Sequence, residues 1–183
     1  MFAARLYSPA QCNSILENVR SVDDWRGARV LVNTEGSFAD ALQPKIREAL
    51  IVSRVHATEI YREFEEKVSQ IVRPMIETIW GADLAGCEGT QLIRYKAGGH
   101  YRAHKDADEM AFANRYFTVL CYLNDDFVGG GTSFPSLRFT AMPIPGKTLI
   151  FPSRFLHSAL AVEQGEKFAF LTWVCGPVPI RWL

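Results

Sequence analysis

The sequence predicts an α+β protein with a mainly β core, built as a jelly roll or barrel with N-terminal helices packed on one face. Two observations predict it. Amphipathic helical patterns mark roughly the first 80 residues, and after Gly81 the chain changes to short apolar runs between glycines and prolines. About seven or eight closely spaced strands behind a helical lead-in favour a β structure that helices cover on one side.

Two helices are predicted in the lead-in. The first runs from Ser8-Pro9 to about Val19, because serine is a favoured N-cap and proline suits the first helical position. Its apolar stripe consists of Cys12, Ile15, Leu16 and Val19. The second pattern runs from Ala57 to Trp80, with apolar residues three or four positions apart. Pro74 should kink or split it, since proline has no amide proton to donate inside a helix.

The remaining segments are predicted to be strands and loops. In the mixed region 23–55, "ARVLVN" is a short strand candidate and "EGSFADALQPK" is interpreted as a loop. The strand candidates after Gly81 are "TQLIRY", "HYRAHKD", "YFTVLCYLN", "TSFPSLRFTAMPI", "KTLIFPS", "HSALAVE" and "KFAFLTWV". A β structure of this kind forms a rigid cup, which is a favourable place for a ligand.

Charge and cysteine usage argue against several classes of function. The 20 basic and 20 acidic residues balance, so no net field would attract nucleic acid or an anionic membrane. The four cysteines lie far apart, which argues against a cysteine zinc site and against a disulfide framework. No signal peptide and no run of roughly 18 apolar residues is present. We therefore expect a reduced, cytoplasmic protein with no membrane partner, and nothing in the charge indicates a nucleic-acid partner.

The stretch "AGGHYRAHKDAD" (97–108) concentrates two histidines and two aspartates. His104 and Asp106 are two positions apart, so on a strand they would point to the same face. His56, His100 and His157 remain as candidates for a third ligand, and His157 begins a late strand candidate. Two histidines and one carboxylate on one side of a metal leave three positions open, which is typical of non-haem iron(II) oxygenases. Zinc more often has four protein ligands, or three and a water.

The residues around this pair resemble motifs of the prolyl 4-hydroxylase-like iron(II)/2-oxoglutarate-dependent dioxygenases. "YKAGGHYRAHKD" is similar to the family's first metal motif, which is Tyr, a glycine-containing turn, Tyr, two residues and His-x-Asp. The matching positions are Tyr95, Gly98, Tyr101, His104 and Asp106. "RYFTVLCYLND" resembles the family strand R-x-x-T-x-x-x-YLN through Arg115, Thr118, Tyr122, Leu123 and Asn124.

The resemblance continues toward the C-terminus. "GGGTSFP" (129–135) is similar to the family stretch Gly-Gly-x-Thr-x-Phe-Pro, with Gly131 where the family usually has glutamate. "PIPGKTLIFPS" matches its proline, glycine and strand pattern. "HSALAVEQGEKFAFLTW" matches the distal histidine, a glycine turn and a basic residue ten positions after the histidine. The likeness covers roughly residues 90–175 in the right order, whereas residues 1–80 show no comparable match.

This resemblance implies a double-stranded β-helix of the jelly-roll or cupin-like type. Residues 1–183 would form a single domain, with 1–86 as a helical lead-in and substrate-recognition segment and 87–183 as the jelly-roll catalytic core. His104, Asp106 and His157 would be the catalytic residues and the ligands of Fe(II). The cosubstrates would be 2-oxoglutarate and O2, and ascorbate would be the reductant.

The reaction that the resemblance implies is hydroxylation of an aliphatic C–H, coupled to decarboxylation of 2-oxoglutarate to succinate. The substrate would be an amino-acid-like small molecule or a peptide, with a prolyl residue as one option. Halogenases related to this family have alanine or glycine in place of the carboxylate ligand. Asp106 therefore favours hydroxylation over halogenation.

The distal carboxylate of 2-oxoglutarate needs a buried cation, and the resemblance makes Lys167 the candidate. "VEQGEK" is interpreted as a hairpin turn around Gly165 that returns this lysine to the adjacent strand. Tyr95 and Tyr122 are expected to add hydroxyl donors to the cosubstrate site, and Trp173 to line its wall. The alternatives are an exposed hairpin lysine, and ordinary core packing for the three aromatic residues.

Arg115, Tyr101 and His100 are candidate substrate contacts, with His100 at the rim of the pocket or in a loop. The arginines that could clamp a substrate carboxylate are Arg47, Arg54, Arg115, Arg138 and Arg154. Arg115 is preferred because it resembles a family residue near the site, and a surface arginine is the alternative for each. Segments 33–45 and 107–114 are expected to form substrate lids. Asp108 is expected in solvent, and His56 at the surface or as a helix cap.

Two other functions remain open from the sequence. A jelly-roll module could keep the three metal ligands as a non-catalytic metal-binding or sensor site, and a cupin-type isomerase or hydrolase would work without O2. "AMPIPGKT" (141–148) fits a loose phosphate-binding-loop pattern, but its prolines and the strand that follows argue against that function.

Overall fold

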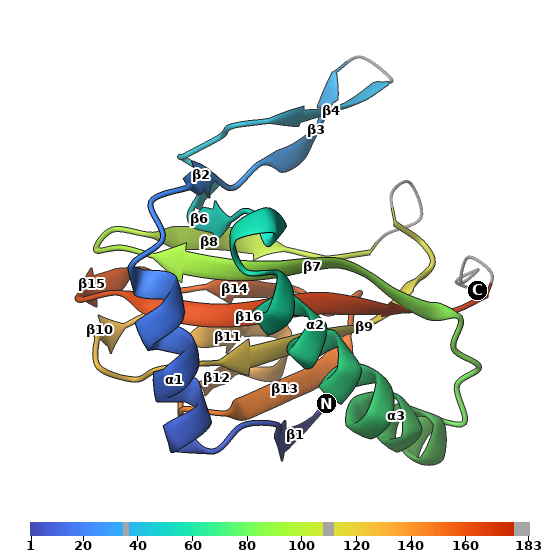
Figure 1. Ribbon diagram of the computed structural model, residues 1–183. Helices are drawn as coiled ribbons and strands as arrows, with labels where there is room; N and C mark the ends of the chain where they lie inside the picture. Colours follow the sequence, from blue (N-terminus) through green and yellow to red (C-terminus); the bar gives the residue numbers. More distant parts are fainter. Residues whose placement is uncertain (35–36, 108–111, 178–183) are drawn as a thin grey trace.

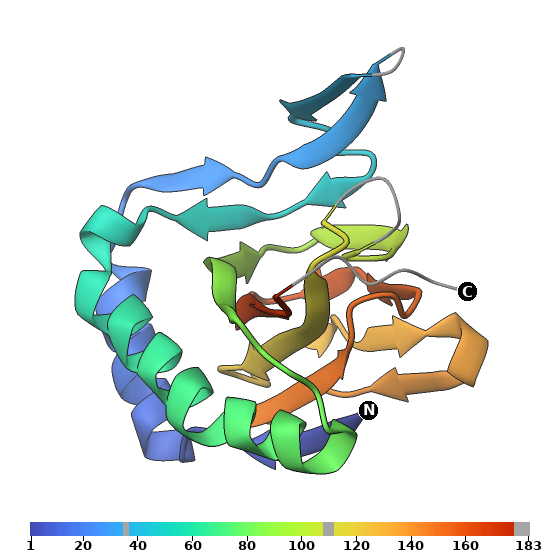
Figure 2. The same ribbon diagram turned by 90° about the vertical axis from the view of Figure 1, so that its right-hand side faces the viewer.

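A computed structural model describes residues 1–34, 37–107 and 112–177 of the chain. Two antiparallel sheets form the body of the fold, and the helices lie along one side of it (Figures 1 and 2). The larger sheet consists, in spatial order, of β1 (Phe2–Arg5), β13 (Lys147–Pro152), β9 (Arg115–Tyr122), β16 (Lys167–Cys175), β7 (Gly86–Tyr95), β6 (Leu50–Val52) and β2 (Trp25–Gly27). The smaller sheet consists of β12 (Phe139–Ala141), β11 (Thr132–Phe134), β14 (His157–Ala159), β8 (His100–His104) and β5 (Arg47–Glu48).

Two short strand pairs complete the β structure. One is the hairpin of β3 (Val30–Thr34) and β4 (Ser37–Ala41), which extends away from the sheets in both ribbon views. The other pairs β10 (Val128–Gly129) with β15 (Val162–Gln164). The lead-in is therefore not only helical, because β1, β2, β5 and β6 all come from it and join the two sheets.

The first helix, α1 (Pro9–Arg20), confirms the predicted N-terminus. Ser8 accepts a hydrogen bond from the backbone of Gln11, whose side chain accepts one from the backbone of Ser8. This reciprocal capping satisfies amide protons that have no partner inside the helix. The predicted apolar stripe is the buried face of this helix.

The second helical pattern folds as three consecutive segments, α2 (Thr58–Lys67), a π-helical turn (Val68–Val72) and α3 (Arg73–Trp80). Pro74 cannot donate the regular backbone hydrogen bond, and the widened π turn lies directly before it. The predicted interruption at Pro74 is thus confirmed. Single 3₁₀ turns occur at Arg54–His56 and Pro135–Leu137.

The larger sheet has a hydrophobic core on each face, because successive side chains of its strand β16 point to opposite faces. Phe168 and Phe170 of β16 pack against the helices, where the rings of Phe64 and Phe170 stack with centroids 4.4 Å apart. Ala169 points to the other face, among Tyr122, Phe151 and residues of β11. This alternation is the period of two that a strand imposes.

Four local predictions were wrong. The segment "EGSFADALQPK" is not all loop, since residues 37–41 pair with β3. The run 132–144 is broken by the 3₁₀ turn at Pro135–Leu137, and the run 157–163 divides into β14 and β15. The turn at Gly165 is not a hairpin, because β15 pairs with β10 whereas β16 lies between β7 and β9. That turn carries the chain from the β10–β15 pair to the larger sheet.

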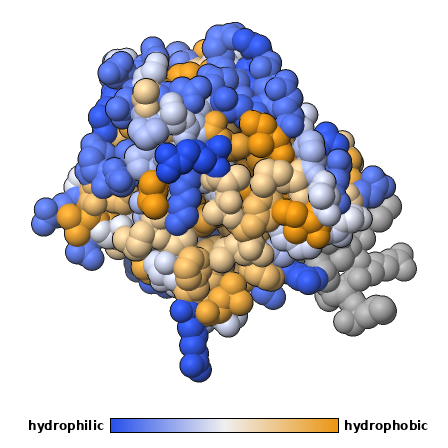
Figure 3. All heavy atoms as spheres, turned by 90° about the horizontal axis from the view of Figure 1, so that it is seen from below, coloured by the Kyte–Doolittle hydropathy of each residue, from blue (hydrophilic) through white to orange (hydrophobic). Residues whose placement is uncertain are grey.

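Apolar residues gather among polar ones on the end of the molecule that is seen from below (Figure 3). In the described ranges, no helix is both long enough and apolar enough to cross a membrane.

Candidate active site

A cavity of about 490 Å³ lies between the two sheets. Its walls come from β7, β9 and β16 on one side and from β5, β8, β11 and β14 on the other. Leu31 and Asp40 of the β3–β4 hairpin also line it, as do Ala107 and Phe112. The two expected lid segments therefore both contribute to the wall, although residues 35–36 and 108–111 lie outside the described chain.

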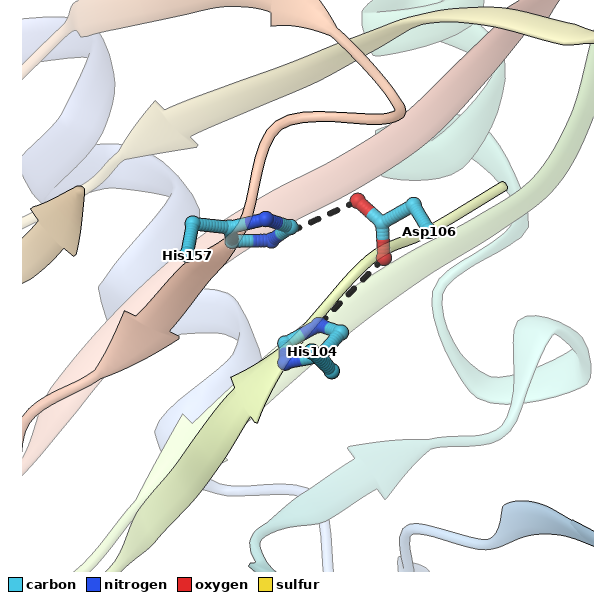
Figure 4. A group of neighbouring side chains, drawn as sticks. All are labelled: His104, Asp106 and His157. Atoms are coloured by element: carbon cyan, nitrogen blue, oxygen red, sulfur yellow. Dashed lines mark ion pairs between the residues drawn. The ribbon is translucent and has the colours of Figure 1, made fainter. Parts of the chain in front are cut away.

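His104, Asp106 and His157 meet in this cavity, and one potential ligand atom from each lies within 4.8 Å of the others. His104 ends β8 and His157 begins β14, directly opposite each other in the antiparallel register. Figure 4 shows the carboxylate of Asp106 facing both imidazole rings. Nε2 of His104 lies 3.4 Å from Oδ1, and Nε2 of His157 lies 3.4 Å from Oδ2.

Asp106 reaches this position in a different way from the predicted one. β8 ends at His104, so the two residues do not share a strand face. Instead the chain crosses toward the larger sheet, where the backbone amides of Asp106 and Ala107 donate to the carbonyl of Ser153 at 2.9 and 3.2 Å. The Thr118 hydroxyl donates to Oδ2 of Asp106 at 2.7 Å, and Ser153 Oγ lies 3.0 Å from that hydroxyl. Both sheets therefore build the cluster.

The two imidazole rings are oriented by backbone carbonyls. Nδ1 of His104 lies 2.8 Å from the carbonyl oxygen of Arg102, and Nδ1 of His157 lies 2.9 Å from that of Phe155. A carbonyl can only accept, so Nδ1 carries the proton in the neutral ring and Nε2 keeps its lone pair. Nε2 is the atom that faces Asp106 in both residues, and this second hydrogen bond is typical of metal-binding histidines.

The protonation of the cluster suits a divalent cation. Burial by itself raises the pKa of Asp106, but nearby His157 and His104 and the Thr118 hydrogen bond outweigh it, and the pKa lies well below its usual range. Burial lowers the pKa of His157. A carboxylate and two neutral imidazoles are the states in which these groups bind metal. The donor set thus fits Fe(II) with one open side.

Lys167 lies deep in the same cavity, and its side chain is only 1% exposed. Its Nζ donates to the carbonyl of Gly130 at 2.6 Å and lies 5.2 and 5.3 Å from the ring centroids of Tyr95 and Tyr122. Within the described ranges, no carboxylate forms an ion pair with it, and burial lowers its pKa to about 7. A cation held in this way is suited to an anionic ligand.

The glycine run 129–131 makes room for this lysine. Gly130 has φ +64, and a Cβ at this position would lie 3.3 Å from Cδ of Lys167. The predicted turn is therefore also part of the lysine pocket. Thr132 was missed as a site residue although its motif was recognised. It lines the cavity and accepts a 2.7 Å hydrogen bond from the Tyr122 hydroxyl, beside the lysine.

Of the three aromatic candidates for the cosubstrate site, Tyr95 and Trp173 line the cavity, whereas Tyr122 is completely buried behind it. Tyr122 still helps to form the environment of Lys167 through its ring and its bond to Thr132. Burial raises the pKa of Tyr122 and Tyr95, so both remain protonated. Trp173 has a buried indole N–H with no partner in the described chain.

The preferred substrate arginine is already engaged. Nε of Arg115 donates to Glu88 at 2.6 Å, and its guanidinium lies 3.6 Å from the ring centroids of both Phe112 and Trp173. Its Nη1 also donates to the backbone carbonyl of Asp106 at 3.3 Å. Arg115 lines the cavity next to the metal cluster, but Glu88 already balances its charge.

Of the other histidine and tyrosine candidates, one lines the cavity and the others do not. Tyr101 lines the cavity and stacks on His104, with ring centroids 3.5 Å apart. His100 begins β8, is not among the described residues that line the cavity, and has Nδ1 3.0 Å from the Gly98 carbonyl. His56 is half exposed and lies 3.3 Å from Asp24. Asp108 lies outside the described chain. The phosphate-loop pattern is excluded, since Lys147 begins β13 and its Nζ donates to Met142.

Five arginines were candidates to bind a substrate carboxylate, and Arg115 was preferred. Arg47 is instead the one that is buried in the cavity without a carboxylate partner in the described chain. It is buried, lines the cavity from β5, and its Nη2 donates to the side chain of Gln91 at 2.8 Å. Arg54 is paired with Glu65, and Arg138 and Arg154 are exposed. No sequence signal separates Arg47 from these, because its burial follows from the pairing of β5 with β8.

Comparison with known proteins agrees with this geometry. Residues 90–175 match the family model of the 2OG-Fe(II) oxygenase superfamily. Over 87% of its length the chain is 23% identical to prolyl 4-hydroxylase subunit alpha-1 of Bos taurus, and it spans only 37% of that relative. Most of that larger protein therefore has no counterpart in this chain.

Solved structures show the same fold. A viral collagen prolyl hydroxylase of Paramecium bursaria Chlorella virus-1, in complex with 2-oxoglutarate, superposes with a TM-score of 0.65 at 18% identity, covering 97% of this chain and 96% of that one. A Trichoplax adhaerens prolyl hydroxylase, bound to a peptide fragment of hypoxia inducible factor, gives a TM-score of 0.73 at 16% identity, covering 95% and 82%. The predicted jelly roll with helices on one face is confirmed.

Proposed function

We propose that this chain, whose residues 90–175 match the family model of the 2OG-Fe(II) oxygenase superfamily, is an iron(II)/2-oxoglutarate-dependent dioxygenase that hydroxylates an aliphatic C–H. The observation that carries the proposal is a single cavity that holds two different sites. His104, Asp106 and His157 converge at one place in it, and the buried cation of Lys167 lies at another. A metal with open positions and a separate cation match the two ends of 2-oxoglutarate.

Three side chains would hold the iron. These are His104 and His157 through Nε2, and Asp106 through its carboxylate. When bound, Fe(II) would activate O2. One oxygen atom would enter succinate as 2-oxoglutarate loses CO2, and the other would become the hydroxyl group on the substrate carbon. The retained carboxylate of Asp106 favours hydroxylation over halogenation.

The protein itself orients the reactants. Thr118 and the carbonyl of Ser153 fix Asp106, so the carboxylate cannot rotate away from the two imidazoles. Lys167 would bind the distal carboxylate of 2-oxoglutarate, with Thr132 as a second polar contact next to it. Phe151 packs edge-on against His157 at 4.9 Å, which keeps that side of the site apolar. Exclusion of water strengthens each of these charged contacts.

We propose that the substrate is amino-acid-like or peptidyl, with a prolyl residue as one option. The relatives in the comparison are prolyl hydroxylases, and one of the solved structures contains a peptide. The β3–β4 hairpin and the wall near Phe112 are the segments of this chain that would select the substrate, because they line the cavity but belong to neither sheet. Ascorbate as the reductant and a cytoplasmic location remain predictions of the same proposal.

The test is formation of succinate from 2-oxoglutarate by the purified chain with Fe(II), ascorbate and O2. We expect succinate to form and His104→Ala to abolish it, because the metal loses one of three ligands. The matched control is His56→Ala, which removes an exposed histidine paired with Asp24 outside the cavity. A calorimetric titration of 2-oxoglutarate into the Mn(II)-loaded protein measures binding without turnover.

Iron-loaded protein that neither binds 2-oxoglutarate nor forms succinate would refute the proposal. Metal binding without 2-oxoglutarate binding would instead favour the sensor or structural metal module. Turnover of a substrate in the absence of O2 would favour an isomerase or hydrolase.

A further inference from the structure

Arg47 is a buried cation in the cavity that the proposed reaction does not use. Its side chain lines the cavity, and the residue is only 6% exposed. Nη2 donates to Gln91 at 2.8 Å, Nη1 has a long 3.4 Å contact with the carbonyl of Arg29, and Nε is buried without a hydrogen-bond partner. Over residues 1–34, 37–107 and 112–177, no carboxylate forms an ion pair with this guanidinium.

The two cations already considered for the site, Arg115 and Lys167, both have partners in the described chain. Arg115 is paired with Glu88, and Nζ of Lys167 donates to the carbonyl of Gly130 at 2.6 Å. Burying a charge without a partner anion is costly, so a guanidinium in this state is suited to a ligand that brings the anion. Arginine is the side chain that holds a planar carboxylate best, since it can donate two parallel hydrogen bonds.

The position of Arg47 relates it directly to the metal cluster. Arg47 pairs with Tyr101 across β5 and β8, and its guanidinium lies 4.9 Å from the Tyr101 ring centroid. Tyr101 in turn stacks on His104 at 3.5 Å. The three side chains therefore form a stack whose last member is a proposed metal ligand. A group bound at Arg47 would lie beside Tyr101, and a short molecule would extend from there toward the metal face.

We propose that Arg47 binds a carboxylate of the substrate, so that the substrate is a small carboxylic acid such as a free amino acid. This inference rests on the proposed function, but the binding of a carboxylate at Arg47 can be measured without turnover. The cavity of about 490 Å³ must also hold the cosubstrate, which leaves room for a small molecule. Arg29 also lines the cavity, and its Nη2 donates to the backbone carbonyl of Asp40 at 2.8 Å.

The test measures carboxylate binding by NMR with the full chain in the Lys167→Met background, which removes the other buried cation. Acetate is the probe and the isosteric, uncharged acetamide is its control. We expect saturable shifts of the Arg47 Nε–H signal and of the Tyr101 amide with acetate, and none with acetamide. Arg47→Gln should weaken acetate binding at least tenfold, as followed by the Tyr101 amide. Arg138→Gln, which changes an exposed arginine, should leave it unchanged.

Arg47→Lys is the second variant, because it keeps the charge but loses the two-pronged donor and should bind with intermediate affinity. N-acetylglycine and an end-blocked tetrapeptide with one internal glutamate separate a small acid from an acidic peptide. The small acid should bind more tightly. Tighter binding of the peptide, equal response to acetamide, or unchanged acetate binding in Arg47→Gln would each overturn the proposal. If succinate forms but acetate does not bind, only the Arg47 site is rejected. If acetate binds but the iron-loaded protein forms no succinate, only the dioxygenase function is rejected.

Discussion

The affinity for 2-oxoglutarate is predicted to fall steeply as the pH rises above 7, because of Lys167. Burial lowers the pKa of this lysine from 10.5 to about 7 in the unliganded protein. Its Nζ has a carbonyl partner, but none of the described carboxylates pairs with it. A bound 2-oxoglutarate carboxylate would return the pKa toward its ordinary value, since an adjacent anion favours the charged form.

The magnitude follows from the two protonation states. Below pH 7 the lysine is already charged and the affinity should not depend on its titration. Between pH 7 and the higher pKa of the complex, one proton must be taken up for each 2-oxoglutarate bound. The dissociation constant should therefore rise about tenfold per pH unit, or about 1.4 kcal/mol. Between pH 7 and 9 this amounts to roughly a hundredfold loss of affinity.

The assay is calorimetric titration of 2-oxoglutarate into Mn(II)-loaded protein at several pH values from 6.5 to 9. Buffers with different ionisation enthalpies report the proton uptake, which should approach one per ligand at pH 8 to 9. Lys167→Arg provides the control, because arginine stays charged throughout this range and should flatten the profile. An affinity that is the same at pH 7 and pH 9, with no proton uptake, would falsify the assignment of Lys167 to the carboxylate.

Three further predictions concern metal binding and stability. Thr118→Val should weaken metal binding about 10- to 100-fold, as measured by competition with a chelator, because Asp106 loses the hydrogen bond that orients it. Gly146→Ala should lower the free energy of unfolding by about 2 kcal/mol or more in denaturant titrations, since Gly146 has φ +79 and a Cβ there would lie 1.8 Å from the carbonyl oxygen of Tyr7. Lys167→Met should raise the melting temperature of the unliganded protein at pH 7. The penalty for burying a charged lysine is present below the pKa of the unfolded state and grows as the pH falls toward 7. An unchanged or lower melting temperature would contradict the buried, unpaired state of Lys167.

Local patterns in the sequence were sufficient for much of the fold and of the candidate site. The cap at Ser8 and the interruption at Pro74 are decided by groups within a few residues, so both were predicted correctly. The first strand of the β3–β4 hairpin was predicted from "ARVLVN", whereas β4 was interpreted as a loop, because its pairing with β3 is made between backbones. The hairpin predicted at Gly165 failed because which sheet a strand joins is decided by distant partners.

The sequence by itself determined which chemical groups are available: the motif that holds His104 and Asp106, a later histidine and a lysine ten positions beyond it. Only the tertiary structure decided how they act. Asp106 meets the histidines because Thr118 of the larger sheet and Ser153, which directly follows β13, hold it, not because of its spacing from His104. Arg47 became a buried cation through the pairing of β5 with β8, while Arg115 acquired a carboxylate partner. Charge balance depends on neighbours in space, and these neighbours come from segments that the sequence places far apart.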